Sequence, residues 1–390
     1  MVEALKSMNK KYLLIIASIF LLLFLIIIVV AITRSCSRPG SNYTKVENKM
    51  VDAARKYYKK NTDARPSEGE SSSISVAALA EGKYMKPLSK YLKDSACTGD
   101  VKIYNNGGQY LIIPNLECTD YKTTHIVDKI KKDNLVEHSI PAKVEVNQDN
   151  NENNTDIVSE NDYTSGLYDI NGTYVFMGKN PNNYISIAGV KWRIIDIDEN
   201  NIMRVLKINS ENRSARWDSK YNIELKKSVG INDYKNSGIL EKLNEEYGKF
   251  KDSNKVHLAP MDVCIAKRNN DSLGISKDVD CAEKLEKQYI SLVNSGDYAR
   301  ASLDEHCTSI TSGSCNNYNY LSYLLYQTWT TNAMSDNTYQ AIAINGGVAK
   351  GFDAKESLKY HWVVALNGNE LYTSGSGTEK DPYVLVKKSK

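Results

Sequence analysis

The chain has 390 residues, of which 25% are charged and 41% hydrophobic, and this length is sufficient for more than one folded domain. Its formal net charge is +3, but residues 1–38 hold five basic side chains and one acidic one, so the rest of the chain carries a net charge of −1. A nearly neutral surface does not attract polyanions, and we therefore expect no nucleic-acid partner.

An uninterrupted apolar run, Leu13–Ile32, lies near the start of the chain. A helix of this length rises by about 30 Å, which is the thickness of the hydrocarbon core of a bilayer. The run is longer than the apolar region of a cleaved signal peptide. It therefore predicts a single-pass transmembrane helix over residues 13–33, after a cytoplasmic tail of residues 1–12. The expected location is the cell membrane, with the lipid bilayer as a partner.

Cysteine spacing indicates on which side of the membrane the remainder lies. Six of the seven cysteines form pairs that are close in sequence: Cys97 with Cys118, Cys264 with Cys281, and Cys307 with Cys315. Such pairs are typical of disulfides in an oxidising compartment, so the bulk of the chain is expected outside the cell, although the last four cysteines could also pair in a crossed order. Cys36 is left over and could be acylated, could join two chains or could be idle. No zinc-type spacing occurs, and we expect no metal.

A first small module is expected over residues 41–135. Helical spacing of apolar residues predicts a helix from Thr44 to Asn61 and a short helix from Ile74 to Gly82. Val101–Tyr104 and Gln109–Ile113 are predicted to pair as a hairpin, because two asparagines and two glycines lie between them. Residues 136–162 lose this apolar periodicity, which predicts a polar linker.

A larger domain is expected over residues 163–390. Apolar patterning predicts strands at Tyr174–Met177, Ile185–Ile187, Val190–Ile197, Ile202–Ile208, Gln340–Asn345, His361–Leu366 and Tyr383–Val386. Helices are predicted at Ile239–Phe250 and Leu321–Met334. Strands and helices do not alternate regularly, so the predicted fold class is α+β rather than a doubly wound sheet.

The first module resembles pilin-like or pseudopilin-like modules of bacteria. The resemblance rests on the apolar helix, on the Ala53–Tyr58 segment, on Ser73–Pro87, and on the cysteines around the hairpin. The Gly and Glu that mark prepilin processing are absent from the run at Leu13–Ile32, so a fixed anchor is expected. The resemblance implies a disulfide-stapled α+β module and pilin-like partners.

The second domain resembles uncharacterised bacterial surface domains of C-type-lectin-like, or sulfatase-modifying-factor-like, fold. The matching pieces are Lys191–Asp196, Tyr234–Ser237, the strand with Trp362, and the closing segment Gly375–Tyr383. The resemblance implies an α+β scaffold that displays loops, and it implies no activity.

Two polar loops are the candidate contact surfaces, Asn209–Tyr221 and Thr308–Tyr318, because loops that join regular elements commonly carry binding residues. Their amide, charged and aromatic side chains could contact a glycan or a protein. The candidate binding residues are Arg213, Arg216, Trp217, Asp218, Tyr221, Asn316 and Tyr318.

Motifs for catalysis are missing from the sequence: it contains no G-x-S-x-G, no Walker loop, no H-E-x-x-H and no dinucleotide fingerprint. We expect no enzyme activity and no cofactor. Cys307 and Cys315 beside His306 are the only candidates for the cysteine pair of a formylglycine-generating enzyme, and a structural bridge is the favoured interpretation.

The sequence therefore predicts a non-enzymatic, membrane-anchored surface protein that displays a recognition or adhesion domain. Two alternatives stay open. The first is a pilin-like component of a secretion or competence apparatus, and the second is a membrane enzyme of the formylglycine-generating type.

Overall fold

The computed structural model describes residues 41–137, 140, 163–208, 213–250, 252–269 and 272–385. The described residues form two compact units: the first comprises residues 41–60, 74–101 and 114–122, and the second comprises residues 61–73, 102–113 and the described residues from 123 to 385. The helix α5 (Ile126–Asn134) belongs to the second unit, whereas composition alone places it in the first module.

The expected fold class needs a correction. It combined a transmembrane helix, a pilin-like module and a C-type-lectin-like domain, whereas the described residues form an α+β structure with mostly strands and few helices. The longest described helix, α3 (Ser41–Lys60), carries lysines and acidic residues between its apolar ones, and no described helix is long and apolar enough to cross a bilayer. The predicted span Leu13–Ile32 lies outside the described residues.

The small sheet and its helices follow the sequence pattern closely. The strands β1 (Ser71–Ser75), β2 (Thr98–Asn106) and β3 (Gln109–Glu117) form a sheet in that order. The predicted hairpin is confirmed, and its turn uses Gly107 and Gly108, both at positive φ. The predicted first helix is confirmed as α3, while the second, α4 (Val76–Glu81), begins only after β1. A Cβ on Gly99 would lie 3.1 Å from Met50 Cε, so α3 packs closely against β2.

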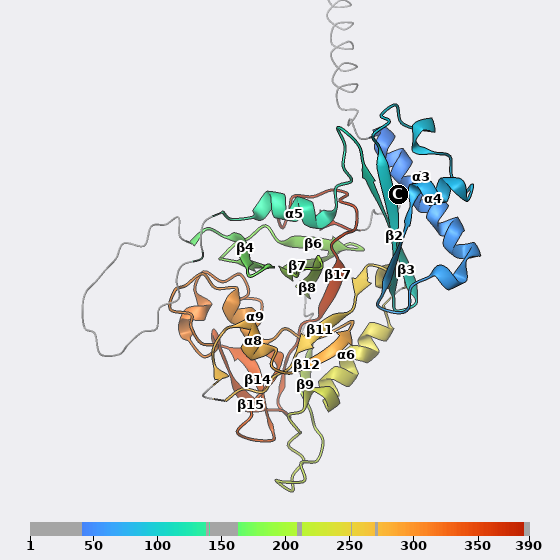
Figure 1. The fold of residues 1–390 in the computed structure, drawn as a ribbon. Coiled ribbons are helices and arrows are strands. Elements are labelled where there is room, and N and C mark those ends of the chain that lie inside the picture. The colour runs from blue at the N-terminus through green and yellow to red at the C-terminus, as the bar shows by residue number, and fades with distance from the viewer. Residues whose placement is uncertain are drawn as a thin grey trace, which may run out of the picture. The chain divides into compact units, whose positions relative to one another are not determined.

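An eight-stranded sheet is the centre of the second unit (Figure 1). Its main path has the order β10-β17-β8-β7-β5-β4, and β6 joins β7 to β18. The bounds are β4 (Gly166–Ile170), β5 (Thr173–Met177), β6 (Tyr184–Ile187), β7 (Val190–Ile197), β8 (Ile202–Lys207), β10 (Leu258–Ala259), β17 (Val363–Asn367) and β18 (Tyr383–Val384). Six of these strands, β5, β6, β7, β8, β17 and β18, agree with the predicted ranges to within two residues at each end. In Figure 1, α5 lies on one side of the sheet and α8 and α9 lie on the other.

A five-stranded sheet, in the order β15-β14-β13-β16-β9, completes the core. The bounds are β9 (Ser214–Arg216), β13 (Thr328–Ala333), β14 (Gln340–Asn345), β15 (Val348–Asp353) and β16 (Ser357–Lys359). A separate pair is formed by β11 (Met261–Cys264) and β12 (Lys284–Gln288), and the remaining helices are α6 (Gly238–Gly248), α7 (Asp252–Lys255), α8 (Lys277–Asp280) and α9 (Ser295–Arg300). Buried side chains of α5, α6 and both large sheets form one hydrophobic cluster.

The prediction of a helix over Leu321–Met334 is wrong. Turns occupy the first part of this segment, and the rest is β13, in which all six residues are buried. Gln327 has a positive φ of 52°, which ends any helix before it. Thr328, Trp329 and the threonines that follow are β-branched or aromatic, and such residues favour strands.

All three local cysteine pairs form disulfides, as predicted: Cys97–Cys118, Cys264–Cys281 and Cys307–Cys315. The last four cysteines are therefore joined in sequence order and are not crossed. The chain between the paired cysteines is short, with separations of 21, 17 and 8 residues. Loop-closure entropy for bridges of this size gives a stabilisation of about 3 kcal/mol each.

A chain of ion pairs crosses the interior of the second unit. It runs through Asp196, Arg204, Asp297, Arg300, Asp280 and Arg268, none more than 19% exposed at its side chain. Arg204 pairs with its cross-strand neighbour Asp196, and its Nη2 lies 2.7 Å from Asp297 Oδ1. Arg300 lies 2.9 Å from Asp297 and 2.5 Å from Asp280. Asp280 is also paired with Arg268. The chain thus links β7 and β8 to α8 and α9.

Gly296 is the position that lets α9 approach this chain. A Cβ on Gly296 would lie 1.7 Å from Asp280 Oδ2 and 2.6 Å from Arg300 Nη1. Any side chain at residue 296 would therefore displace the carboxylate from its guanidinium partners.

The Asp297→Asn substitution should destabilise the protein in a pH-dependent way. Burial alone would raise the pKa of Asp297, but the guanidiniums of Arg204 and Arg300 lower it to about 2. Its unfolded value is near 3.8, so the stabilisation is complete above pH 4 and is lost as the pH falls towards 2. At pH 7 the variant should lose about 3–5 kcal/mol of unfolding free energy, as expected when one partner of a buried ion pair is removed. Urea unfolding at a series of pH values measures this loss of unfolding free energy.

The difference in unfolding free energy between wild type and Asp297→Asn should narrow between pH 4 and pH 2. Only the wild type has the stabilisation from ionised Asp297 to lose over this range. The exposed Glu224 serves as the control, since Glu224→Gln changes a carboxylate outside the ion chain. A constant difference across this range would contradict the role of Asp297.

Candidate functional site

The second predicted contact loop borders an open hollow on the second unit. The hollow has a volume of about 610 Å³. Its lining comes from three places in the sequence: Tyr163 before β4, Lys179 after β5, and the loop between α9 and β13. Of the predicted binding residues, Asn316 and Tyr318 line it. We define this feature as the tyrosine hollow.

Two stacked rings form its aromatic part. The rings of Tyr163 and Tyr318 are nearly parallel, with centroids 4.0 Å apart. Tyr318 is 42% exposed even though it is a large aromatic side chain. Its φ is +43°, a conformation that non-glycine residues rarely adopt. Where they do adopt it, the residue often belongs to a functional site. The loop therefore holds an aromatic ring at the surface.

Polar groups of fixed geometry lie beside the rings. The carboxylate of Asp304 accepts hydrogen bonds from Asn317 Nδ2 at 2.7 Å and from the His306 backbone N–H at 2.8 Å. Glu305, His306 and Asn316 also line the hollow. Carboxylates accept hydrogen bonds, and amides both donate and accept them. The hollow therefore offers an aromatic surface next to groups that can bind hydroxyls.

The wall of the hollow is anchored beneath the surface. Cys307 and Cys315 are bonded and fully buried, and they bring the two ends of the loop together. Asn319 is also buried. Its Nδ2 donates to the carbonyls of Tyr298 and Cys315, both at 2.7 Å, and its Oδ1 accepts from the Leu321 N–H at 2.8 Å. These contacts fix the backbone on both sides of Tyr318.

The central residues of the first predicted contact loop, Trp217 and Asp218, are buried in the core. Trp217 is fully buried and its Nε1 donates to the Thr330 carbonyl at 2.9 Å. Asp218 is 2% exposed, and its carboxylate accepts from the N–H groups of Ile231 at 2.7 Å and Gly238 at 3.1 Å. Both side chains are buried, and neither lines the tyrosine hollow.

The other candidates of that loop lie apart from the hollow. Arg213 pairs with Glu246 at 3.5 Å, and its guanidinium lies 5.0 Å from the centre of the Trp362 ring. Arg216 is an exposed residue of β9, and Tyr221 is 55% exposed on the loop that follows. The structure does not bring Arg213, Arg216 and Tyr221 together with Asn316 and Tyr318 in one pocket.

The cysteine pair considered for formylglycine chemistry is a buried disulfide, and Cys307 Sγ lies 3.4 Å from the Ala299 carbonyl. Within the described residues, the one group of side chains close enough to hold a metal ion is Asp94, Cys97 and Cys118. Its two sulfurs are joined in a disulfide and are not thiolates.

Several lining residues of the hollow have no signal in the sequence. Tyr163 marks only the expected start of a domain, and Lys179 lies in an ordinary turn. They reach Tyr318 through the fold, since more than 130 positions separate them from it. The feature in the sequence that could have located the site is the short, polar loop closed by Cys307 and Cys315.

No family model, no curated protein and no solved structure matches this chain.

The Asn319→Ala substitution tests how the hollow is anchored. It should lower the unfolding free energy by about 2–4 kcal/mol, because two buried carbonyls and one buried N–H lose their partner. Urea unfolding measures the effect. The matched control is Asn316→Ala, in which an exposed amide of the same loop is removed, and it should change the unfolding free energy by about 0.5 kcal/mol or less. Equal effects of both variants would contradict the assigned roles.

Proposed function

We propose that this chain is a non-catalytic recognition protein that binds a glycan at the tyrosine hollow. The observation that carries the proposal is the exposed ring of Tyr318, stacked on Tyr163 and bordered by amide and carboxylate groups. An aromatic ring can pack against the C–H face of a sugar, while neighbouring polar groups bind its hydroxyls. Binding sites of this size commonly combine one such apolar surface with a few fixed polar groups.

The disulfides support action in an oxidising compartment. Three bridges among six cysteines are characteristic of secreted or surface-exposed domains and are rare in reducing compartments. Glycans are abundant in the same compartment. A rigid, cross-linked loop also loses little conformational entropy when it binds, which improves affinity for a weakly held ligand.

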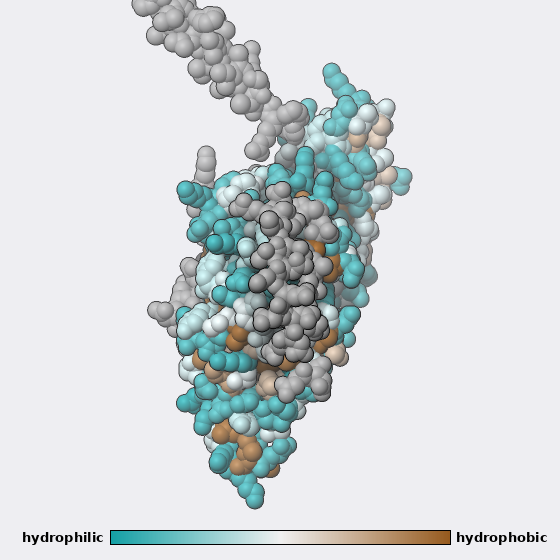
Figure 2. Space-filling view, turned by 90° about the vertical axis from the view of Figure 1, so that its left-hand side faces the viewer, coloured by the Kyte–Doolittle hydropathy of each residue, from teal (hydrophilic) through white to brown (hydrophobic). Residues whose placement is uncertain are grey.

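Figure 2 shows one face of the molecule coloured by hydropathy. Hydrophilic residues predominate on that face, and hydrophobic residues occur as small separate patches. Stable protein interfaces commonly have a larger apolar centre. Apart from Tyr163 and Tyr318, the lining of the tyrosine hollow consists of polar and charged residues, which favours a ligand with many hydroxyl groups.

The experiment is binding of the purified protein to an array of neutral, N-acetylated and acidic oligosaccharides, followed by calorimetry with the best oligosaccharide. Tyr318→Ala should weaken binding at least tenfold, because the stacking surface is lost. Tyr318→Phe keeps the ring and should retain most of the affinity. Tyr221→Ala removes an exposed tyrosine outside the hollow and should leave binding unchanged.

Two outcomes would contradict the proposal. The first is the absence of binding to any oligosaccharide of the array by a folded protein. The second is binding that Tyr221→Ala weakens and Tyr318→Ala does not, which would place the contact on the first predicted loop.

A further inference from the structure

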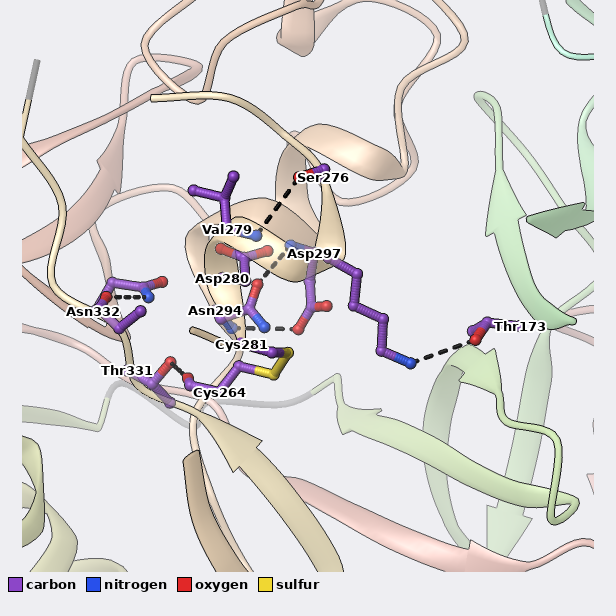
Figure 3. Close-up of a disulfide and its surroundings, with 12 residues drawn as sticks. Thr173, Cys264, Ser276, Val279, Asp280, Cys281, Asn294, Asp297, Thr331 and Asn332 are labelled. Atoms are coloured by element: carbon purple, nitrogen blue, oxygen red, sulfur yellow. Dashed lines mark hydrogen bonds between the residues drawn. A yellow bond between two sulfur atoms is a disulfide. The ribbon is translucent and has the colours of Figure 1, made fainter. Parts of the chain in front are cut away.

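Two adjoining chambers lie in the second unit, and the smaller one is lined by the disulfide Cys264–Cys281. Figure 3 shows this disulfide and its surroundings. The volumes of the two chambers are about 330 Å³ and 420 Å³. Both are lined by Asp196, Lys277 and Arg300, so these three side chains form the wall between them. Each chamber alone is within the size range of small-molecule sites.

The smaller chamber is lined by charges of both signs. Arg204 and Arg300 belong to its wall, but the buried carboxylates of the ion chain already compensate them. The remaining charged lining residues are two lysines, Lys277 and Lys284, and three acids, Asp198, Glu199 and Asp262. Burial raises the pKa of Asp198, so a cation beside it would favour its ionised form. The chamber thus provides sites for an anionic and a cationic group.

The larger chamber combines five apolar side chains with polar and charged residues, which include Asn171 and Asp278. Its lining includes Ile140, Ile170, Val175, Met177 and Ile275. Burial of an apolar side chain in such a chamber is favourable in proportion to the area removed from water. The smaller chamber, with its charged lining, and the larger chamber, with its five apolar side chains, therefore share one wall.

Lys277 crosses the boundary between them. Its Nζ donates a hydrogen bond to Thr173 Oγ1 of β5 at 3.3 Å, a long distance to a neutral acceptor, and the bond is drawn in Figure 3 at Thr173. Lys277 is itself an exposed residue. A ligand carboxylate would be a stronger acceptor for the ammonium than this hydroxyl, because hydrogen bonds between charged groups are shorter and stronger. Exchange of partners would open the wall.

The backbone that carries Lys277 is held at both ends. Lys277 is the first residue of α8, which Ser276 caps by accepting from the Val279 N–H at 3.4 Å. At the other end, Cys281 is bonded to Cys264 of β11. Asp280, the last residue of α8, is part of the buried ion chain. The lysine side chain can therefore move while its backbone stays in place.

We propose that the two chambers form one cleft that binds a short zwitterionic peptide with an aliphatic side chain. The peptide carboxylate pairs with Lys277 and Lys284, and its ammonium pairs with the acids of the smaller chamber, Asp198, Glu199 and Asp262. The aliphatic side chain enters the larger chamber. This site is separate from the tyrosine hollow and takes a different class of ligand.

The test is calorimetric titration of the full chain with the dipeptide Leu-Leu, with its N-acetylated form and with its C-terminal amide. Leu-Leu should bind, and each capped form should bind at least tenfold more weakly, because one charge is lost in each. Gly-Gly, which lacks the aliphatic side chains, should also bind at least tenfold more weakly.

Two substitutions distinguish the role of Lys277 from that of its hydrogen-bond partner Thr173. Lys277→Met keeps the length of the side chain and should weaken Leu-Leu binding at least tenfold. Thr173→Val removes the competing hydroxyl and should leave the affinity equal or higher. The control is Lys355→Met, which removes an exposed lysine that does not line either chamber.

The proposal is overturned if Leu-Leu fails to bind, if the capped forms bind as well as Leu-Leu, or if Lys277→Met and Lys355→Met give the same affinity. Failure of this proposal is distinguishable from failure of the glycan proposal. Tyr318→Ala should weaken oligosaccharide binding at least tenfold and leave Leu-Leu binding intact, whereas Lys277→Met should weaken Leu-Leu binding at least tenfold and leave oligosaccharide binding intact.

Discussion

The buried chain of ion pairs from Asp196 to Arg268 is the constraint on which the second unit depends. Removing six charges from water is costly, and the cost is offset only when each charge has partners of opposite sign at hydrogen-bond distance. Asp280 and Asp297 each meet two guanidiniums, and Arg204 and Arg300 each meet two carboxylates. The geometry allows little variation, and this requirement positions α8 and α9 against the large sheet. The absence of a side chain at Gly296 follows from it.

Two disulfides complement the ion chain. One closes the segment that supplies two members of the ion chain, and the other closes a surface loop of the same unit. Cys264 and Cys281 enclose the segment that contains Arg268 and Asp280. Cys307 and Cys315 enclose the loop that leads to Tyr318. Each of these segments has little regular secondary structure of its own, and in such segments covalent closure is an effective way to limit the conformations of the unfolded chain. The loops can then keep polar and strained residues in place without a helix or strand to hold them.

Features set by neighbouring residues could be predicted from the sequence. The hairpin around Gly107, the strand Val190–Ile197 and the three cysteine pairs depend on local patterns, and all are found. The segment after Leu321 was misassigned because its aromatic spacing fits a helix, while tertiary pairing with β14 and β16 makes its second half a strand.

The chemistry of the interior could not be predicted in this way. Arg204 and Asp297 are separated by 93 positions, and Lys277 and Thr173 by 104. No local pattern marks such partners. Trp217 and Asp218 illustrate the converse problem, since residue types common in binding sites are also used to build a core. The candidate hollow was located in part because Asn316 and Tyr318 lie next to a local bridge.

The charge balance of the interior bears on how the two surfaces would select ligands. Three arginines and three aspartates of the ion chain neutralise one another, so the wall of the cleft contributes fixed dipoles and little net potential. The charges that remain for a ligand are those of the exposed Lys277 and Lys284 and of the acids that line the same chamber. With a net charge of −1 beyond residue 38, the chain has no strong field to steer ions from a distance. Selection at either surface therefore has to come from short-range fit: stacking at Tyr318 in one case, and simultaneous pairing of both ends of a zwitterion in the other.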